Sequence, residues 1–105
     1  LRAELEAQFA GLKLDALVSI SNGPAWKTDW VAGDRFQVGS SSLAAVSGLP
    51  SVIVPAGAVR GLPVAVSFIG PPLGEATLLR VGAAFEAAAD ARIEPRFLPT
   101  LENPM

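Results

Sequence analysis

Two short apolar runs joined by a tight link constrain the fold of this chain more than any other feature. SVIVPAG at 51–57 and LPVAVSFIG at 62–70 are rich in β-branched residues, which is typical of strands, and a turn around Arg60 and Gly61 separates them. The link is too short for a crossover connection, so the two strands are expected to pair antiparallel. The sequence therefore predicts a β-hairpin in the second half of the chain.

Helical patterns precede this hairpin. Leu5, Phe9 and Leu12 recur at helical spacing and predict a short amphipathic helix over 2–10. A second short helix is expected over 40–46, where serines precede an apolar turn and a glycine and a proline follow it.

The segment GEATLLRVGAAFEAAADA at 74–91 carries the strongest helical pattern. Gly74 can occupy the N-cap, Glu75 faces the positive end of the helix dipole, and alanine, the best helix former, dominates the body. Polar side chains form only a narrow edge along this segment. The helix is therefore expected to be nearly buried.

Three further segments complete the organisation. The near-continuous apolar run LDALVSI at 14–20 suits a strand buried on both faces. Residues 22–37 lack periodicity and predict a long ordered loop, and the Pro-rich tail at 93–105 should lie extended over the surface. The fold class is thus α/β, or α+β for the chain taken alone. Its elements follow in the order helix-strand-loop-helix-strand-strand-helix within a single domain, 1–105.

The balance of apolar and charged residues bears on what surrounds the chain. Of its 105 residues, 50% are hydrophobic and only 17% are charged, against roughly 25% charged in an average soluble domain. This imbalance predicts a piece of a larger protein. No apolar run reaches the roughly 20 residues of a membrane-spanning helix, and a net charge of −2 leaves no basic stripe for nucleic acid. We therefore expect neither a membrane nor a nucleic acid as a partner. The lack of cysteine leaves the compartment open between cytoplasm and periplasm.

The chain has no histidine and no cysteine, which excludes zinc sites built on those ligands and any Ser-His or Cys-His pair within it. The run from Ser40 to Ser42 could supply a nucleophile only with another base. Lys13 and Lys27 have no evident reason to be neutral. We therefore expect one of these serines to cap the helix that follows.

The stretch NGPAWKTDW at 22–30 has the greatest potential for specificity. It holds Trp26, Asp29 and Trp30, and aromatic rings with a few polar groups are typical of ligand pockets, so these three are the candidate substrate-binding residues. The indoles could instead anchor the loop to the core, and the sequence leaves both interpretations open. Asp29 and Asp34 lack further metal ligands nearby, so we assign no metal and no other cofactor.

Three motifs follow one another with short connections over 43–86: AAVSGLPSVIVPAG, GLPVAVSFIG and GEATLLRVGAAFE. In this order they resemble the C-terminal part of the amidase signature family. The upstream stretch LDALVSISNGPAWKTDW resembles the peptide amidase branch of that family. One departure is Ala65, which stands where the family often has glycine in the GLPxG strand. Alanine is tolerable there if nothing approaches the backbone closely.

The resemblance implies a part of the mixed central sheet of an amidase and one wall of its substrate pocket. The activity it implies is hydrolysis of carboxamides, such as C-terminal peptide amides, through an acyl-serine intermediate without a cofactor. The family uses a serine nucleophile, a second serine and a lysine, and its nucleophilic region lies in a Gly-Ser-rich run upstream of the matched part. GSSSLAAVSGLP is not that run. No catalytic residue is therefore assigned, and the chain is expected to lack the catalytic half and to be inactive alone.

Two other interpretations stay open: a non-catalytic binding or assembly module with the same elements, and an independent serine hydrolase that uses Ser40 to Ser42. The isolated chain is also expected to form a homo-oligomer, because its strands would be exposed. The residues expected at or near that contact are Val18, Ile20, Val52 or Val54.

Overall fold

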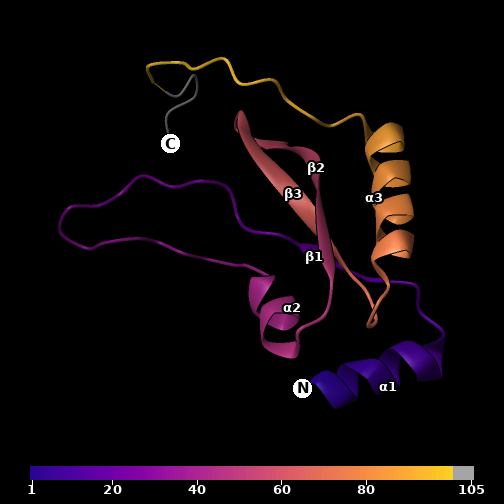
Figure 1. Cartoon of the computed structure of the whole chain (residues 1–105). Coiled ribbons are helices and arrows are strands. Elements are labelled where there is room, and N and C mark those ends of the chain that lie inside the picture. Colours follow the sequence, from indigo (N-terminus) through magenta and orange to yellow (C-terminus); the bar gives the residue numbers. More distant parts are fainter. Residues whose placement is uncertain (101–105) are drawn as a thin grey trace.

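The computed structural model describes residues 1–100. It contains the expected elements in the expected order, helix-strand-loop-helix-strand-strand-helix (Figure 1). They are α1 (Arg2–Leu12), β1 (Leu17–Ile20), α2 (Ser41–Ser47), β2 (Ser51–Val59), β3 (Leu62–Ile69) and α3 (Glu75–Ala89).

The strands form a three-stranded sheet in the order β1-β3-β2, with β3 antiparallel to both neighbours. The hairpin of β2 and β3 is confirmed: Val59 pairs with Leu62, so only Arg60 and Gly61 form the turn. Both turn residues have positive φ, 52° and 79°. Left-handed backbone at both central positions matches the twist of the flanking strands, and glycine adopts it without strain.

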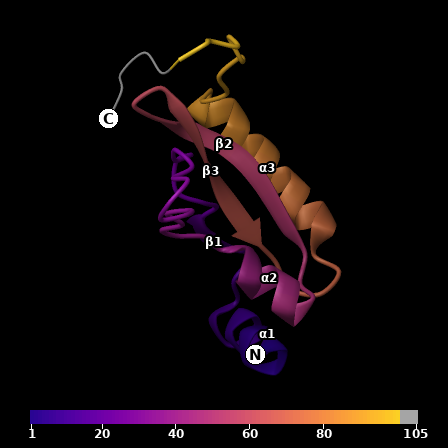
Figure 2. The same cartoon turned by 90° about the vertical axis from the view of Figure 1, so that its left-hand side faces the viewer.

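Each face of the sheet carries its own apolar cluster. On one face, Val54 and Phe68 pack against Leu78 of α3, and Figure 2 shows α3 running along the hairpin. On the other face, Ile69 packs with Phe9 of α1 and with Leu49, which follows α2. Neighbouring residues of a strand point to opposite faces, so β3 contributes to both clusters and forms the centre of the fold.

The motif glycine at the end of β3 allows α3 to approach the sheet. A Cβ atom added at Gly70 would lie 3.0 Å from Cγ of Leu78 and 3.1 Å from both of its methyl carbons. Leu78 is completely buried. The close approach therefore requires a residue without a side chain at position 70, which connects two of the sequence motifs physically.

Two expectations about burial are wrong. The strand at 14–20 is shorter, Leu17–Ile20, and it is not buried on both faces, because Val18 is 65% and Ile20 is 56% exposed. These two side chains share the sheet face on which α3 lies, but α3 covers the hairpin and not β1. Likewise α3 buries only Leu78 and Gly82, since the sheet lies along one side of the helix alone.

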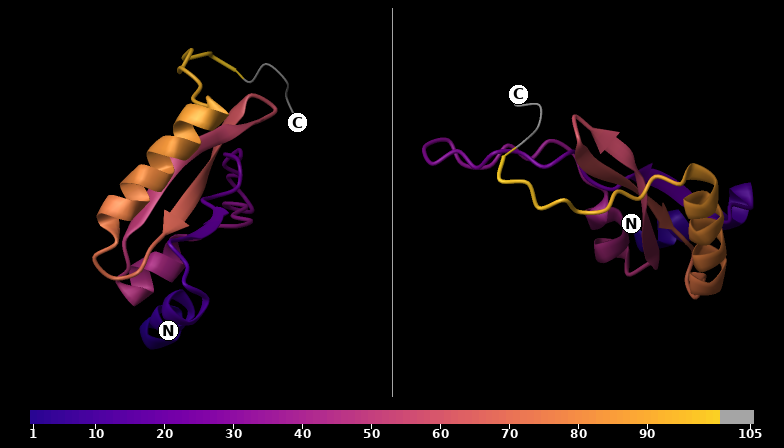
Figure 3. Two further views of the ribbon diagram at one scale, coloured as in Figure 1. Left: turned by 90° about the vertical axis from the view of Figure 1, so that its right-hand side faces the viewer. Right: turned by 90° about the horizontal axis from the view of Figure 1, so that it is seen from above.

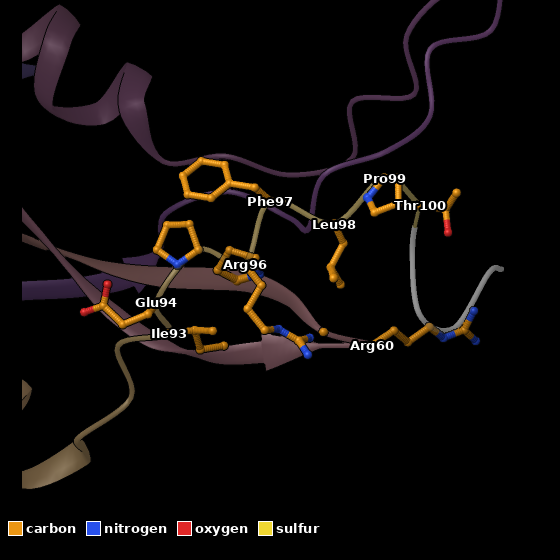
Figure 4. A pocket seen from close by; sticks show the side chains of 11 residues that line it. Arg60, Ile93, Glu94, Arg96, Phe97, Leu98, Pro99 and Thr100 are labelled. Carbon is orange, nitrogen blue, oxygen red and sulfur yellow. The ribbon is translucent and has the colours of Figure 1, made fainter.

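The tail after α3 has no helix or strand over residues 93–100, and it passes the turn of the hairpin (Figure 3). There Ile93, Phe97 and Leu98 line a shallow cavity of about 530 Å³ together with Arg60 (Figure 4). The part of the expected tail at 101–105 lies outside the described residues. Within the part that is described, no helix is long and apolar enough to span a bilayer.

Candidate functional site

The connection between β1 and α2 is a long arm, residues 22–39, that projects from the body of the molecule (Figures 1 and 3). Its two sides meet at the base, where Asn22 pairs with Gly39 and the N–H of Gly23 donates to the carbonyl of Val38 at 3.1 Å. They meet again near the tip, where Asp29 pairs with Gly33. The arm is therefore an irregular hairpin.

The Asp29 carboxylate organises the turn at the tip of the arm. Its Oδ1 accepts the backbone N–H groups of Val31 at 2.8 Å and Ala32 at 3.0 Å. Donation from Ala32, and then from Val31, lowers the pKa of the Asp29 carboxyl from its usual value, because both bonds favour the charged form. Asp29 is thus a turn-forming residue whose side chain is also open to solvent.

The two tryptophans of the arm have different environments. Trp26 is 37% exposed, its indole N–H donates to Oδ1 of Asp34 at 3.2 Å, and its ring meets Phe36 edge to face at 6.1 Å. Trp30 is 96% exposed at the tip. Trp26 therefore holds the two sides of the arm together, whereas Trp30 is available for contact with another molecule.

The three candidate residues come together on one concave surface of about 630 Å³. The surface also includes Lys27 and Thr28 of the same stretch, and three residues of the arm that no sequence pattern assigns: Val31, Arg35 and Gln37. Arg35 and Gln37 lie on the returning side of the arm. Their position depends on the pairing of the two sides, and no local sequence pattern reveals that pairing.

The helix cap expected at one of Ser40 to Ser42 is confirmed in its position but not in its side-chain hydrogen bond. Ser40 stands at the N-cap of α2 but makes no side-chain cap bond. Its Oγ lies 3.2 Å from Oγ of Ser67 and 3.4 Å from the carbonyl oxygen of Ser21. The hydroxyl points to the sheet because a buried partner is available there. Over residues 1–100, no hydrogen bond joins the three serines to a lysine or a carboxylate.

The acidic residues of the arm are engaged within it. Asp29 accepts from the tip and Asp34 from Trp26, so the two carboxylates serve different parts of the arm. No group of three or more metal-binding side chains occurs in the described part of the chain. The side chains that line the concave surface are aromatic, charged and polar.

The comparisons with known proteins agree with the architecture. No protein-family model matches the chain. Over 45 residues it is 56% identical to a glutamyl-tRNA(Gln) amidotransferase subunit from Desulforudis audaxviator and 51% identical to the counterpart from Streptococcus suis. Each of these matches covers 43% of this chain and 9% of the relative.

Solved structures match over much more of the chain. A peptide amidase bound to the competitive inhibitor chymostatin superposes with a TM-score of 0.78 at 36% identity. The native peptide amidase of Stenotrophomonas maltophilia gives 0.72 at 34% identity. Each superposition covers 91% of this chain and 21% of the other, so the chain spans about a fifth of these enzymes.

The fold and these matches define the class that the chain resembles: its α/β architecture is that of a segment of the amidase signature enzymes. Within that class the chain is similar to peptide amidase over most of its length, since each of the two peptide amidase structures matches 91% of it. The resemblance inferred from the three motifs is therefore confirmed.

Proposed function

We propose that this chain serves in an amidohydrolase that cleaves carboxamides, with C-terminal peptide amides as the substrate class, and that its arm lines the substrate side of the active site. The observation that carries the proposal is the superposition with peptide amidase over 91% of the chain. This match covers far more of the chain than the 45 residues shared with the amidotransferase subunits.

The reaction proceeds through an acyl-serine intermediate. A serine oxygen bonds to the carboxamide carbon, the C–N bond breaks, and the nitrogen takes up a proton and leaves as ammonia. Water then cleaves the ester to give the free carboxylate. We assign none of these catalytic roles to this chain and expect it not to turn over amides by itself, since this proposal places the reacting serine in the rest of the amidase.

The role of this chain is to bind and orient the peptide part of the substrate. Trp30 offers an apolar surface for a substrate side chain, and Lys27 and Arg35 offer N–H donors to peptide carbonyl oxygens on the same concave surface. Trp26 and Asp29 hold the shape of that surface through the contacts described above. Together they form one wall of a site that the rest of an amidase completes.

An exposed strip on the sheet favours a second property, self-association of the isolated chain. Val18 and Ile20 lie side by side on β1, which pairs only with β3 among the described strands, so its other edge is open. Val54 is already covered by α3 and cannot contribute. Two copies can pair through β1, with no role in catalysis implied.

The proposal is tested by transplanting this chain into the Stenotrophomonas maltophilia peptide amidase in place of the matching segment. Ammonia release from an amidated peptide is the readout, and circular dichroism checks folding. We expect a folded chimera that releases ammonia. A folded chimera without activity would contradict the proposed function, and an unfolded chimera would contradict the structural equivalence on which it rests. The chain alone, assayed beside it, should release none.

A further inference from the structure

A pair of hydroxyl groups connects the base of the arm to the centre of the sheet. Ser67 lies in β3, the central strand, and is only 3% exposed. Its Oγ is 3.2 Å from Oγ of Ser40, the first residue after the arm. A buried hydroxyl is stable only with a hydrogen-bond partner, so Ser67 constrains the position of Ser40.

The other end of the arm is attached to the same strand. Ser21, the last residue before the arm, donates its N–H to the carbonyl oxygen of Ala65 in β3 at 2.9 Å. The carbonyl of Ser21 in turn accepts the N–H of Ser40 at 3.0 Å. Both ends of the arm are thus attached to one central strand, through Ala65 on one side and Ser67 on the other.

We infer that Ser67 is a positioning residue: through Ser40 it fixes the direction in which the arm leaves the sheet. The backbone bonds at the base bring the two sides of the arm together, and α2, which follows Ser40, packs through Leu43 and Ala44 against the apolar cluster that contains Ile69 of β3. Among the hydrogen bonds of the described residues, the hydroxyl pair is the one that joins Ser40 directly to β3. Without it the base of the arm keeps its backbone bonds but loses its side-chain attachment to the central strand, so the direction of the arm is less fixed. This inference rests on the proposed function, because a fixed arm matters only if its concave surface meets a substrate.

The space beside the hydroxyl pair determines which measurement is informative. An open cavity of about 480 Å³ borders Ser67, Ser40 and Ser21. Water in it can replace a lost hydroxyl partner, so removing one serine should have a small effect on global stability. Water cannot replace the attachment of the arm to the sheet. Arm mobility is therefore the property that should change.

Native-state hydrogen exchange of the 105-residue chain with Ser67→Ala provides the direct test. The amides of Gly23 and Ser40 report on the base of the arm, because both donate hydrogen bonds there. We expect their exchange to accelerate about fivefold, the factor that corresponds to one hydrogen bond of about 1 kcal/mol. Exchange in the core of α3 should not change.

Ser47→Ala is the matched control. Ser47 is 4% exposed, as buried as Ser67, but its hydroxyl bonds to the Leu43 carbonyl inside α2 and not to the sheet. It should leave exchange at Gly23 and Ser40 unchanged. If Ser67→Ala unfolds the chain, Ser40→Ala removes the same bond from its more exposed end and should give the same acceleration. Unchanged exchange at the arm base in a folded Ser67→Ala or Ser40→Ala protein would overturn the inference.

A kinetic measurement separates this inference from the proposed function. In the peptide amidase chimera, Ser67→Ala should raise KM for an amidated peptide about fivefold and leave kcat unchanged, since the chemistry lies elsewhere. Ser67→Thr, which keeps the hydroxyl, should restore KM. Faster exchange at the arm base without a change in KM would support the inference that Ser67 positions the arm, and it would contradict the proposed role of the arm in substrate binding. A fall in kcat with KM unchanged would contradict the positioning role itself.

Discussion

Replacing Gly70 by alanine should destabilise the chain through one specific contact. The new Cβ would lie 3.0 Å from Cγ of Leu78, whose side chain is completely buried, so neither group can move without disturbing the core. The φ of Gly70 lies outside the left-handed region, which means that backbone strain makes no contribution. Overpacking of this kind costs about 1–3 kcal/mol.

The partner substitution makes the prediction specific. Leu78→Ala alone should cost about 2–5 kcal/mol through lost burial and the cavity it leaves. In the double variant the methyl group at position 70 no longer meets a leucine and fills part of that cavity. The loss in free energy of unfolding caused by Gly70→Ala should therefore be smaller by at least about 1 kcal/mol when residue 78 is alanine. The free-energy changes of the two substitutions should not add.

Urea unfolding at one fixed protein concentration measures these free energies. Gly11→Ala is the control, because Gly11 lies within α1 and an added Cβ would meet nothing within 4 Å. That change should stabilise the chain by up to about 1 kcal/mol through helix propensity alone. Strict additivity of Gly70→Ala and Leu78→Ala would refute the proposed contact.

Three further predictions concern the arm and the open strand. In the chimera, Trp30→Ala should raise KM several-fold without changing stability, because the side chain is 96% exposed. Trp26→Ala should instead increase the mobility of the arm. Equal effects of the two variants in fluorescence and kinetics would contradict this distinction. The pKa of the Asp29 carboxyl is lower in the folded chain than in the unfolded chain, so the carboxylate stabilises the turn above the unfolded pKa, and this stabilisation is lost as pH falls through the folded pKa. Amide chemical shifts at the tip of the arm should therefore move during acidification between these two pKa values, and unchanged shifts would contradict the role of Asp29. Sedimentation should show an oligomer that Val18→Lys with Ile20→Lys dissociates, and a wild-type monomer of 10.8 kDa would exclude the β1 contact.

Local patterns predict the hairpin and the helices because their causes are local. The turn at Arg60 and Gly61 requires positive φ, and the alanine-rich run of α3 favours a helix wherever it lies. Burial is harder to predict because it depends on tertiary packing. The exposure of Val18, for example, depends on which strands of the sheet α3 covers.

The candidate site is likewise predictable only where local sequence determines it. Residue type alone points to Trp26, Asp29 and Trp30, and the structure places them on one surface. The sequence does not predict Arg35 as part of this surface, because Arg35 reaches it only when the arm folds back. The local rule favours Ser40 as a cap, but a buried hydroxyl on a strand distant in sequence provides a better partner.

The central claim is that the arm contacts the peptide of a carboxamide substrate, and photo-crosslinking tests it most directly. An amidated peptide carrying a photoreactive aromatic side chain is irradiated with the chimera, and the labelled residues are identified by mass spectrometry. We expect label on the arm, at Trp30 and its neighbours on the concave surface, and loss of that label when chymostatin, the competitive inhibitor of the similar peptide amidase, is added. Label confined to the tail at 93–100, or label on the arm that chymostatin does not reduce, would contradict the account.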